Sequence, residues 1–146
     1  MLIFWIGAFI TFFLDRITKF WVLKWEGNFC SLTSFLNLVK VWNKGIVLGF
    51  FSESGIILQF LLIVTGLGVL IVAYLWAKKS DKFTKGALGM LSGGGLGNLT
   101  DRVLYFAVLD FIDLHLMGYH WPAFNLADVG ITLSIVILFI KLFNKN

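Results

Sequence analysis

The sequence predicts an all-α integral membrane protein with four transmembrane helices and a small β-cradle. Hydrophobic residues make up 59% of the 146 residues and charged residues only 14%, and the mean hydropathy is +0.90. A single domain of this length cannot bury so much apolar surface within itself, because small domains leave a large share of their surface exposed. The apolar residues also gather in four runs long enough to cross a bilayer core of about 30 Å.

We expect one domain, 1–146, with spans over residues 2–23, 55–77, 86–105 and 121–143. The first span carries Asp15 and Lys19, which share a helix face because they lie four residues apart. This pair either makes the helix end tolerable or faces a polar cavity. The second span has no charged residue and is predicted to be structural. The third is rich in glycine, which lets helix backbones approach closely in lipid.

Residues 24–54 differ from the spans and are predicted to form the cradle. Aromatic residues lie among polar ones there, and residues 38–42 have strand propensity. Residues 43–45 offer a turn, after which residues 46–50 resume the strand pattern. This pattern predicts a hairpin at the membrane surface, where aromatic side chains are favoured. Residues 106–122 are predicted to be a short extramembrane connection.

The distribution of lysines predicts the orientation. The loop at 78–85 holds four lysines and one aspartate, and Lys141 and Lys145 follow the last span. Basic loops next to spans are typical of the cytoplasmic side, so both termini are expected there. The cradle and the 106–122 connection then lie outside, in the periplasm or its equivalent. The net charge of +4 is spread along the chain, which does not favour a nucleic-acid partner, and the single Cys30 excludes an intrachain disulfide.

Polar residues able to carry chemistry concentrate between residues 93 and 128. Acidic groups are costly near lipid, so such a cluster is a candidate functional site. Within it, Asn98, Asp101 and Arg102 share one helix face, while Asn125 and Asp128 lie one helical turn apart. The cluster comprises Asp101, Arg102, Asp110, Asp113, His115 and Asp128.

Two carboxylates in this cluster are predicted to lie at the same depth. Asp110 follows the third span and Asp128 lies just inside the fourth, and a short loop joins these antiparallel neighbours. Two close carboxylates do not both ionise readily, so one keeps a proton and the pair can act as general acid and general base on a water. The arrangement predicts aspartic proteolysis, which needs no metal, cofactor or covalent nucleophile.

Other chemistries fit less well. No serine lies in a recognisable nucleophile motif, and the spacing of His115, His120 and the nearby aspartates matches no strong metal motif. A proton-relay or transport role is physically reasonable for acidic residues in a membrane. A small transport or structural membrane protein therefore stays the alternative to an enzyme.

Five motifs in order resemble the bacterial lipoprotein signal peptidases, or signal peptidase II, over nearly the full length. They read DRITK at 15–19, FLNL at 35–38 with NKG at 43–45, GNLTDR at 97–102, VLDF at 108–111 and FNLAD at 124–128. The resemblance implies a four-helix membrane bundle with a periplasmic sheet cradle and a short extramembrane helix. It also implies an aspartic endopeptidase that removes the signal peptide of diacylglyceryl-modified prolipoproteins, cutting just before the lipidated cysteine.

The resemblance implies a role for each matching residue. Asp110 and Asp128 would be the catalytic pair. Asp101 is read as structural because it lies deeper in its span, although it stays the alternative first member of the pair. The asparagines and Arg102 would line the site and hold substrate, the span-one pair would support the pocket, and two small residues would keep room beside the carboxylates. These supporting residues are Asp15, Lys19, Asn43, Gly97, Asn98, Asp101, Arg102, Asn125 and Ala127.

The resemblance also implies location and partners. We expect a multi-pass monomer in the bacterial cytoplasmic (inner) membrane, with its active site facing the periplasm. Its partners would be diacylglyceryl-prolipoproteins, membrane lipid and globomycin-like cyclic peptide inhibitors. Ile46 and Val47 depart from the family pattern, which has small residues there. This departure concerns the shape of the cradle and not the catalytic pair.

Overall fold

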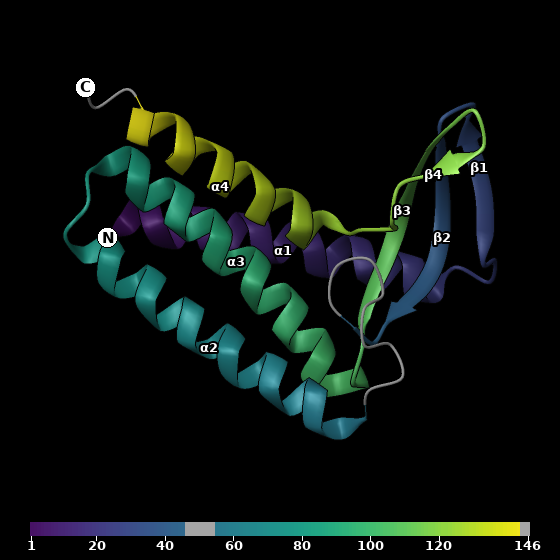
Figure 1. The fold of residues 1–146 in the computed structure, drawn as a ribbon, viewed down its shortest axis with the longest axis horizontal. Helices are drawn as coiled ribbons and strands as arrows, with labels where there is room; N and C mark the ends of the chain where they lie inside the picture. Colours follow the sequence, from purple (N-terminus) through teal and green to yellow (C-terminus); the bar gives the residue numbers. More distant parts are fainter. Residues whose placement is uncertain (46–54, 144–146) are drawn as a thin grey trace.

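The computed structural model describes residues 1–45 and 55–143, which contain four helices and a four-stranded antiparallel sheet (Figure 1). The helices run side by side, with the start of α1 and the end of α4 at the end of the bundle far from the sheet (Figure 1). The elements are α1 (Leu2–Lys24), β1 (Phe29–Thr33), β2 (Leu36–Asn43), α2 (Ile56–Lys78), α3 (Lys82–Tyr105), β3 (Val108–Leu116), β4 (Tyr119–His120) and α4 (Leu126–Phe143).

Helix α3 is the centre of the bundle and packs against α1, α2 and α4. Its glycines make this possible. A β-carbon at Gly89 or Gly93 would collide with the backbone carbonyl of Phe4 or Ala8 in α1, and one at Gly94 would collide with the Ala127 carbonyl in α4. The prediction that the glycine-rich segment serves close helix packing is confirmed by these contacts.

The helix ends differ from the predicted ends for local reasons. Helix α3 begins at Lys82 and not at residue 86, because the Asp81 side chain accepts hydrogen bonds from the backbone N–H groups of Phe83 and Thr84. Such an N-cap satisfies donors that the first turn leaves free. Helix α4 begins at Leu126, five residues later than predicted, because Phe124 pairs with Ile112 of β3 and Asn125 caps the helix.

The sheet has the strand order β1-β2-β3-β4. Strands β1 and β2 form a hairpin whose register runs from Phe29 opposite Val39 to Thr33 opposite Leu36, so its turn lies at residues 34–35. This hairpin precedes the turn predicted at residues 43–45, and the sequence did not predict it. The second predicted strand, residues 46–50, lies outside the described residues, as do Ile46 and Val47.

The connection predicted for residues 106–122 contains two strands, β3 and β4, that the sequence did not predict. Strand β3 pairs with β2, placing Asp110 opposite Val41 and Asp113 opposite Asn37. Residues 108–111 are all buried, so the strand lacks the alternation of buried and exposed residues that marks a half-buried strand. Within residues 1–45 and 55–143 there is no further short helix of the kind that the resemblance implies.

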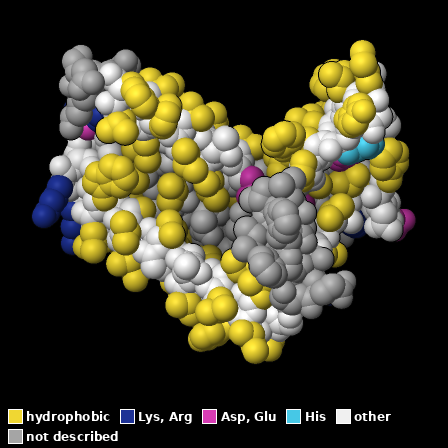
Figure 2. Space-filling view, in the orientation of Figure 1, with side chains coloured by type: hydrophobic (Ala, Val, Ile, Leu, Met, Phe, Trp, Pro, Cys, Tyr) yellow, Lys and Arg dark blue, Asp and Glu magenta, His cyan; other side chains and the backbone are white. Residues whose placement is uncertain are grey.

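Two of the helices, α2 and α4, are long and apolar enough to cross a membrane, within the part of the chain that the structure describes. Large apolar side chains on their surfaces are open to the surroundings. In Figure 2 they cover the helical block, and lysines gather at the end far from the sheet. The same view shows a hollow between the helical block and the sheet, with acidic side chains on its floor (Figure 2).

Candidate active site

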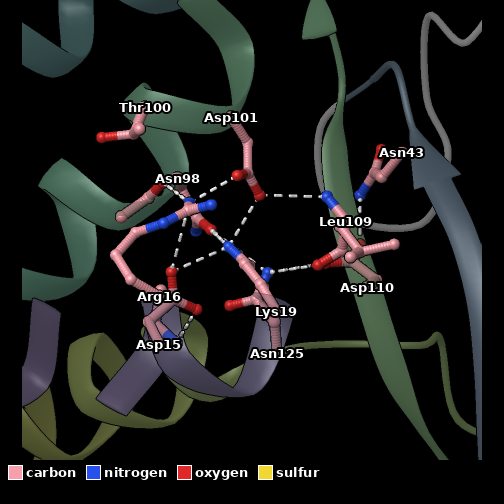
Figure 3. Close-up of polar contacts among 12 residues, drawn as sticks. Asp15, Arg16, Lys19, Asn43, Asn98, Thr100, Asp101, Leu109, Asp110 and Asn125 are labelled. Carbon is pink, nitrogen blue, oxygen red and sulfur yellow. Dashed lines mark hydrogen bonds and ion pairs between the residues drawn. The ribbon is translucent and has the colours of Figure 1, made fainter. Parts of the chain in front are cut away.

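The polar residues of α1, α3, β3 and α4 meet where the helical bundle joins the sheet (Figure 3). Most of them are almost completely buried. Asp15, Lys19 and Asn125 are 0% exposed, Asp101 is 1% exposed and Asp110 is 3% exposed. Because charged groups are rarely buried without partners, the contacts that satisfy them define the site.

Lys19 is at the centre of an ionic cluster. Its Nζ lies 3.0 Å from Asp15 Oδ2 and 2.8 Å from Asp101 Oδ2, and it donates to Asn98 Oδ1 at 3.1 Å. Arg16 Nη1 adds a second cation 2.5 Å from Asp101 Oδ1. Two cations thus balance two carboxylates, and the predicted shared face of Asp15 and Lys19 is confirmed as an ion pair.

Asp101 also fixes where β3 starts. Helix α3 ends at Tyr105, and the next residue, Phe106, has a positive φ of 55° and turns the chain into the strand. Asp101 Oδ2 then accepts a hydrogen bond from the Leu109 backbone N–H at 3.2 Å. The ionic cluster is therefore tied directly to the residue before Asp110, so the position of Asp110 depends on both α3 and α1.

Asn125 and Asp128 form a reciprocal cap at the start of α4. The Asp128 backbone N–H donates to Asn125 Oδ1 at 3.0 Å, and the Asn125 backbone N–H donates to Asp128 Oδ2 at 3.1 Å. This is the geometry of a capping box, in which the first and fourth residues satisfy each other's backbone donors. The cap holds the Asp128 carboxylate in one orientation.

Both candidate catalytic carboxylates are held by asparagine side chains. Asp110 accepts from Asn43 Nδ2 at 3.0 Å and from Asn125 Nδ2 at 2.7 Å. Asp128 Oδ1 accepts from Asn98 Nδ2 at 2.8 Å. Asn125 therefore contacts both carboxylates, one through its amide nitrogen and the other through its cap. This links the two acids in one hydrogen-bonded unit.

The environment of Asp110 favours its protonated form. Burial raises the pKa of the Asp110 carboxyl to about 6, and the nearby Asp128 charge adds to the rise. Hydrogen bonds from Asn43 and Asn125 and the charge of Lys19 act in the opposite direction but do not cancel the effect of burial. A carboxyl group with such a pKa can hold a proton that it later donates.

The small residues beside the carboxylates are in close contact with Asp15. A β-carbon at Gly97 would collide with the Asp15 carboxylate. Ala127 is completely buried and its backbone N–H donates to Asp15 Oδ1 at 3.1 Å. Arg102 points elsewhere, donating to Gln59 Oε1 at 3.0 Å and to the Gly45 carbonyl at 3.1 Å.

Residues 7–144 match the family model of signal peptidase (SPase) II. The chain belongs to the signal peptidase II family.

Similar proteins agree with this assignment. The chain is 38% identical over 143 residues to a lipoprotein signal peptidase of Pelagibacter ubique (strain HTCC1062), covering 94% of this chain and 86% of the relative. It is 41% identical to a lipoprotein signal peptidase of Ralstonia nicotianae (strain ATCC BAA-1114 / GMI1000), covering 93% and 82%. A bacterial membrane enzyme solved by the in meso method at 2.3 Å superposes with a TM-score of 0.83 at 29% identity, covering 97% of this chain and 90% of that one.

The histidines of this signal peptidase II family member lie on the β3–β4 hairpin. The His115 and His120 rings stack with centroids 5.1 Å apart, and His120 Nδ1 lies 2.9 Å from Asp113 Oδ1. Asn37 Nδ2 donates to Asp113 Oδ2 at 2.7 Å. The pKa of Asp113 lies below its usual range: burial acts to raise it, but the hydrogen bonds from Asn37 and His120 outweigh burial. The described residues contain no group of three or more side chains suited to a metal ion.

Two polar residues of the site were missed by the sequence reasoning. Arg16 pairs with Asp101, although its place next to Asp15 in the DRITK motif was a usable signal. Gln59 is 3% exposed and contacts both Arg102 and the Lys44 carbonyl. A single amide in the otherwise apolar 55–77 span was the signal for Gln59, and a purely structural reading of that span overlooked it.

Proposed function

We propose that Asp110 and Asp128 are the catalytic pair of an aspartic endopeptidase that acts on diacylglyceryl-modified prolipoproteins and cuts just before the lipidated cysteine. The single observation that carries the proposal is the Asn125 bridge between the two carboxylates, together with the raised pKa of Asp110. The bridge holds the two acids beside one another, and a close pair of carboxyl groups is what acid–base catalysis on water requires.

The activity of the chain as a prolipoprotein signal peptidase rests on the family. It belongs to the signal peptidase II family over residues 7–144, and its similar relatives are lipoprotein signal peptidases. These matches favour the peptidase over the alternative of a small transport or structural protein. The aspartic mechanism, in contrast, rests on the arrangement of Asp110 and Asp128.

In the mechanism that we propose, the two carboxyl groups have distinct starting roles. Asp128 begins ionised and takes a proton from a water molecule as that water attacks the scissile carbonyl carbon. Asp110 begins protonated and donates to the carbonyl oxygen, and the roles reverse as the tetrahedral intermediate breaks down. The amide groups of Asn43, Asn98 and Asn125 keep both carboxylates oriented during these steps.

The ionic cluster supports the pair without taking part in proton transfer. Both oxygens of Asp101 are occupied by Arg16, Lys19 and the Leu109 N–H. These contacts support a structural role for Asp101 and favour Asp110 as the first catalytic acid. Asp15 likewise accepts from Ala127 and pairs with Lys19. Both acids therefore hold α1, α3, β3 and α4 together beside the pair.

We further propose that all four helices cross the bacterial inner membrane and that both termini are cytoplasmic. The apolar surfaces of α2 and α4 and the lysines at the end far from the sheet support this orientation. Asp15, Lys19 and Asp101 make α1 and α3 more polar, but the pairing of these groups inside the bundle removes most of their cost in lipid. The sheet and the pair then face the periplasm, where the chain acts as a monomer that globomycin-like cyclic peptides block.

The substrate assignment is tested by cleavage of a purified prolipoprotein in detergent, with and without the diacylglyceryl group. We expect cleavage of the modified substrate only, unaffected by a metal chelator, to release a product whose first residue is the lipidated cysteine, as read by mass spectrometry. Equal cleavage of the unmodified precursor would show that the enzyme does not need the diacylglyceryl group to recognise its substrate. A product with a different first residue would contradict the proposed cleavage position.

The raised pKa of Asp110 predicts the pH dependence of the same assay. Because Asp110 must begin protonated, kcat should fall as pH rises through about 6, by about tenfold for each further pH unit. The direction follows from the sign of the shift, since a raised pKa keeps the proton on Asp110 at a pH where an ordinary aspartate has lost it. The measured value belongs to the coupled pair and not to Asp110 alone. A kcat that is constant from pH 5 to about 8 would contradict the assignment of Asp110 as the acid.

A further inference from the structure

Gln59 is a buried amide in the apolar helix α2. Its side chain is only 3% exposed, whereas most of its neighbours on this helix are large apolar residues open to the surroundings. An amide in such a place costs free energy unless its donors and acceptor are paired. Its contacts therefore show what the residue holds.

Gln59 and Arg102 both donate hydrogen bonds to the backbone just after β2. The Gln59 amide nitrogen donates to the Lys44 carbonyl, and its Oε1 accepts from Arg102 Nη1 at 3.0 Å. Arg102 Nη2 donates to the next carbonyl, that of Gly45, at 3.1 Å. Two consecutive backbone carbonyls are thus held by side chains from α2 and α3.

The backbone of Lys44 and Gly45, held in this way, orients the side chain of Asn43. The Gly45 backbone N–H donates to Asn43 Oδ1 at 3.0 Å, which forms a local turn. With its oxygen engaged in this way, the Asn43 amide presents its nitrogen to Asp110 Oδ2 at 3.0 Å. A continuous series of hydrogen bonds therefore runs from Gln59 through residues 43–45 to Asp110.

We propose that Gln59 is a positioning residue for the catalytic carboxyl of Asp110, acting through the 43–45 turn and the amide of Asn43. This inference rests on the proposed role of Asp110 in catalysis. Gln59 itself touches neither Asp110 nor Asp128 among the contacts of the described residues. It sets the orientation of the one β2 side chain that donates to Asp110.

The expected effect follows from the groups that face Asp110. These are the amides of Asn43 from β2 and Asn125 from the start of α4, with the charges of Lys19, Arg102 and Asp128 nearby. Releasing the Asn43 amide removes one donor that favours ionised Asp110 and leaves the others in place. The proton on Asp110 then persists to higher pH, and its carboxyl group loses one of its two side-chain anchors.

The test uses full-length protein in detergent and the diacylated prolipoprotein. We expect Gln59→Leu to lower kcat about tenfold, with KM changed less than about twofold, and to move the alkaline limb of the pH profile upward. Gln59→Glu keeps an acceptor for Arg102 but loses the donor to Lys44. It should also lower kcat and move the alkaline limb of the pH profile upward. Thr65→Val is the matched control, because the Thr65 hydroxyl in the same helix donates to the Leu61 carbonyl and, among the described residues, to no group of the site.

A double variant separates positioning from general stability. If Gln59 acts through Asn43, Gln59→Leu combined with Asn43→Ala should be no slower than Asn43→Ala alone. Additive losses, or wild-type kcat and pH profile in Gln59→Leu, would overturn the inference. Should Gln59→Leu not fold, Gln59→Glu supplies the readout, and failure of both to fold would assign Gln59 to the fold instead. Cleavage by Asp110→Asn at the wild-type rate would refute the proposed catalytic pair. That outcome differs from every outcome named for the Gln59 variants, so the two failures can be told apart.

Discussion

Replacing Asp110 or Asp128 by asparagine is expected to lower kcat by about 10³-fold or more while leaving the protein folded. Asparagine has the size of aspartate but neither donates a carboxyl proton nor accepts one from water. In Asp110→Asn the proton donor to the scissile carbonyl is lost, and in Asp128→Asn the base that activates water is lost. The measurement is single-turnover cleavage of the diacylated substrate, with thermal unfolding in detergent as the test of folding.

The two variants will differ in their effect on stability. Asp110 accepts hydrogen bonds from two amide nitrogens, and the nitrogen of an asparagine at that position would face one of these donors. A buried donor without an acceptor costs about 1–3 kcal/mol. Asp128→Asn should disturb the capping box, which contributes about 1 kcal/mol. Neither cost is large enough to explain a loss of 10³-fold in activity in protein that remains folded.

Asp113→Asn is the matched control for the pair. Asp113 lies on the same strand as Asp110, is also buried, and also accepts a hydrogen bond from an asparagine of β2. Because it contacts His120 and not Asp128, its replacement should change kcat by less than about threefold.

Activity retained in Asp110→Asn but lost in Asp101→Asn would transfer the catalytic role to Asp101.

The parts of this site that could be predicted from sequence are those set by helical spacing. The Asp15–Lys19 ion pair follows from a separation of four residues, and the Asn125–Asp128 contact follows from a separation of three. The second contact is a helix cap and not a pair within the helix, since Asn125 precedes α4. The spacing therefore predicted the contact correctly and its structural role incompletely.

The parts that could not be predicted depend on pairing between distant segments. Asp110 reaches Asn43 only because β3 lies next to β2 in the sheet, and the burial of residues 108–111 hides the usual strand pattern. The β1–β2 hairpin was not predicted because the turn residues at 43–45 drew the expected hairpin to residues 38–50. In the structure these residues form the local turn that orients Asn43. Their role depends on contacts with Gln59 and Arg102, which no local pattern encodes.

Lys19→Met is expected to destabilise the protein by about 3–5 kcal/mol, the largest stability loss among the changes considered. Lys19 is completely buried and lies within 3.0 Å of carboxylate oxygens of both Asp15 and Asp101. Methionine fills a similar volume but leaves one negative charge more than Arg16 alone can balance. An unpaired buried charge costs far more than the pair contributes, and the unfolding free energy in mixed detergent micelles measures this cost.

The cause of this loss can be separated from the loss of side-chain packing. Lys24→Met, at the exposed end of the same helix, should cost less than about 1 kcal/mol, because Lys24 only lies over the Phe20 ring. Adding Asp15→Asn to Lys19→Met removes one of the two carboxylates and should restore part of the lost stability. If the double variant is as unstable as the sum of the single variants, charge balance is not the cause. Recovery of stability would show that the Lys19 ammonium is retained because two buried acids must be neutralised beside the catalytic pair.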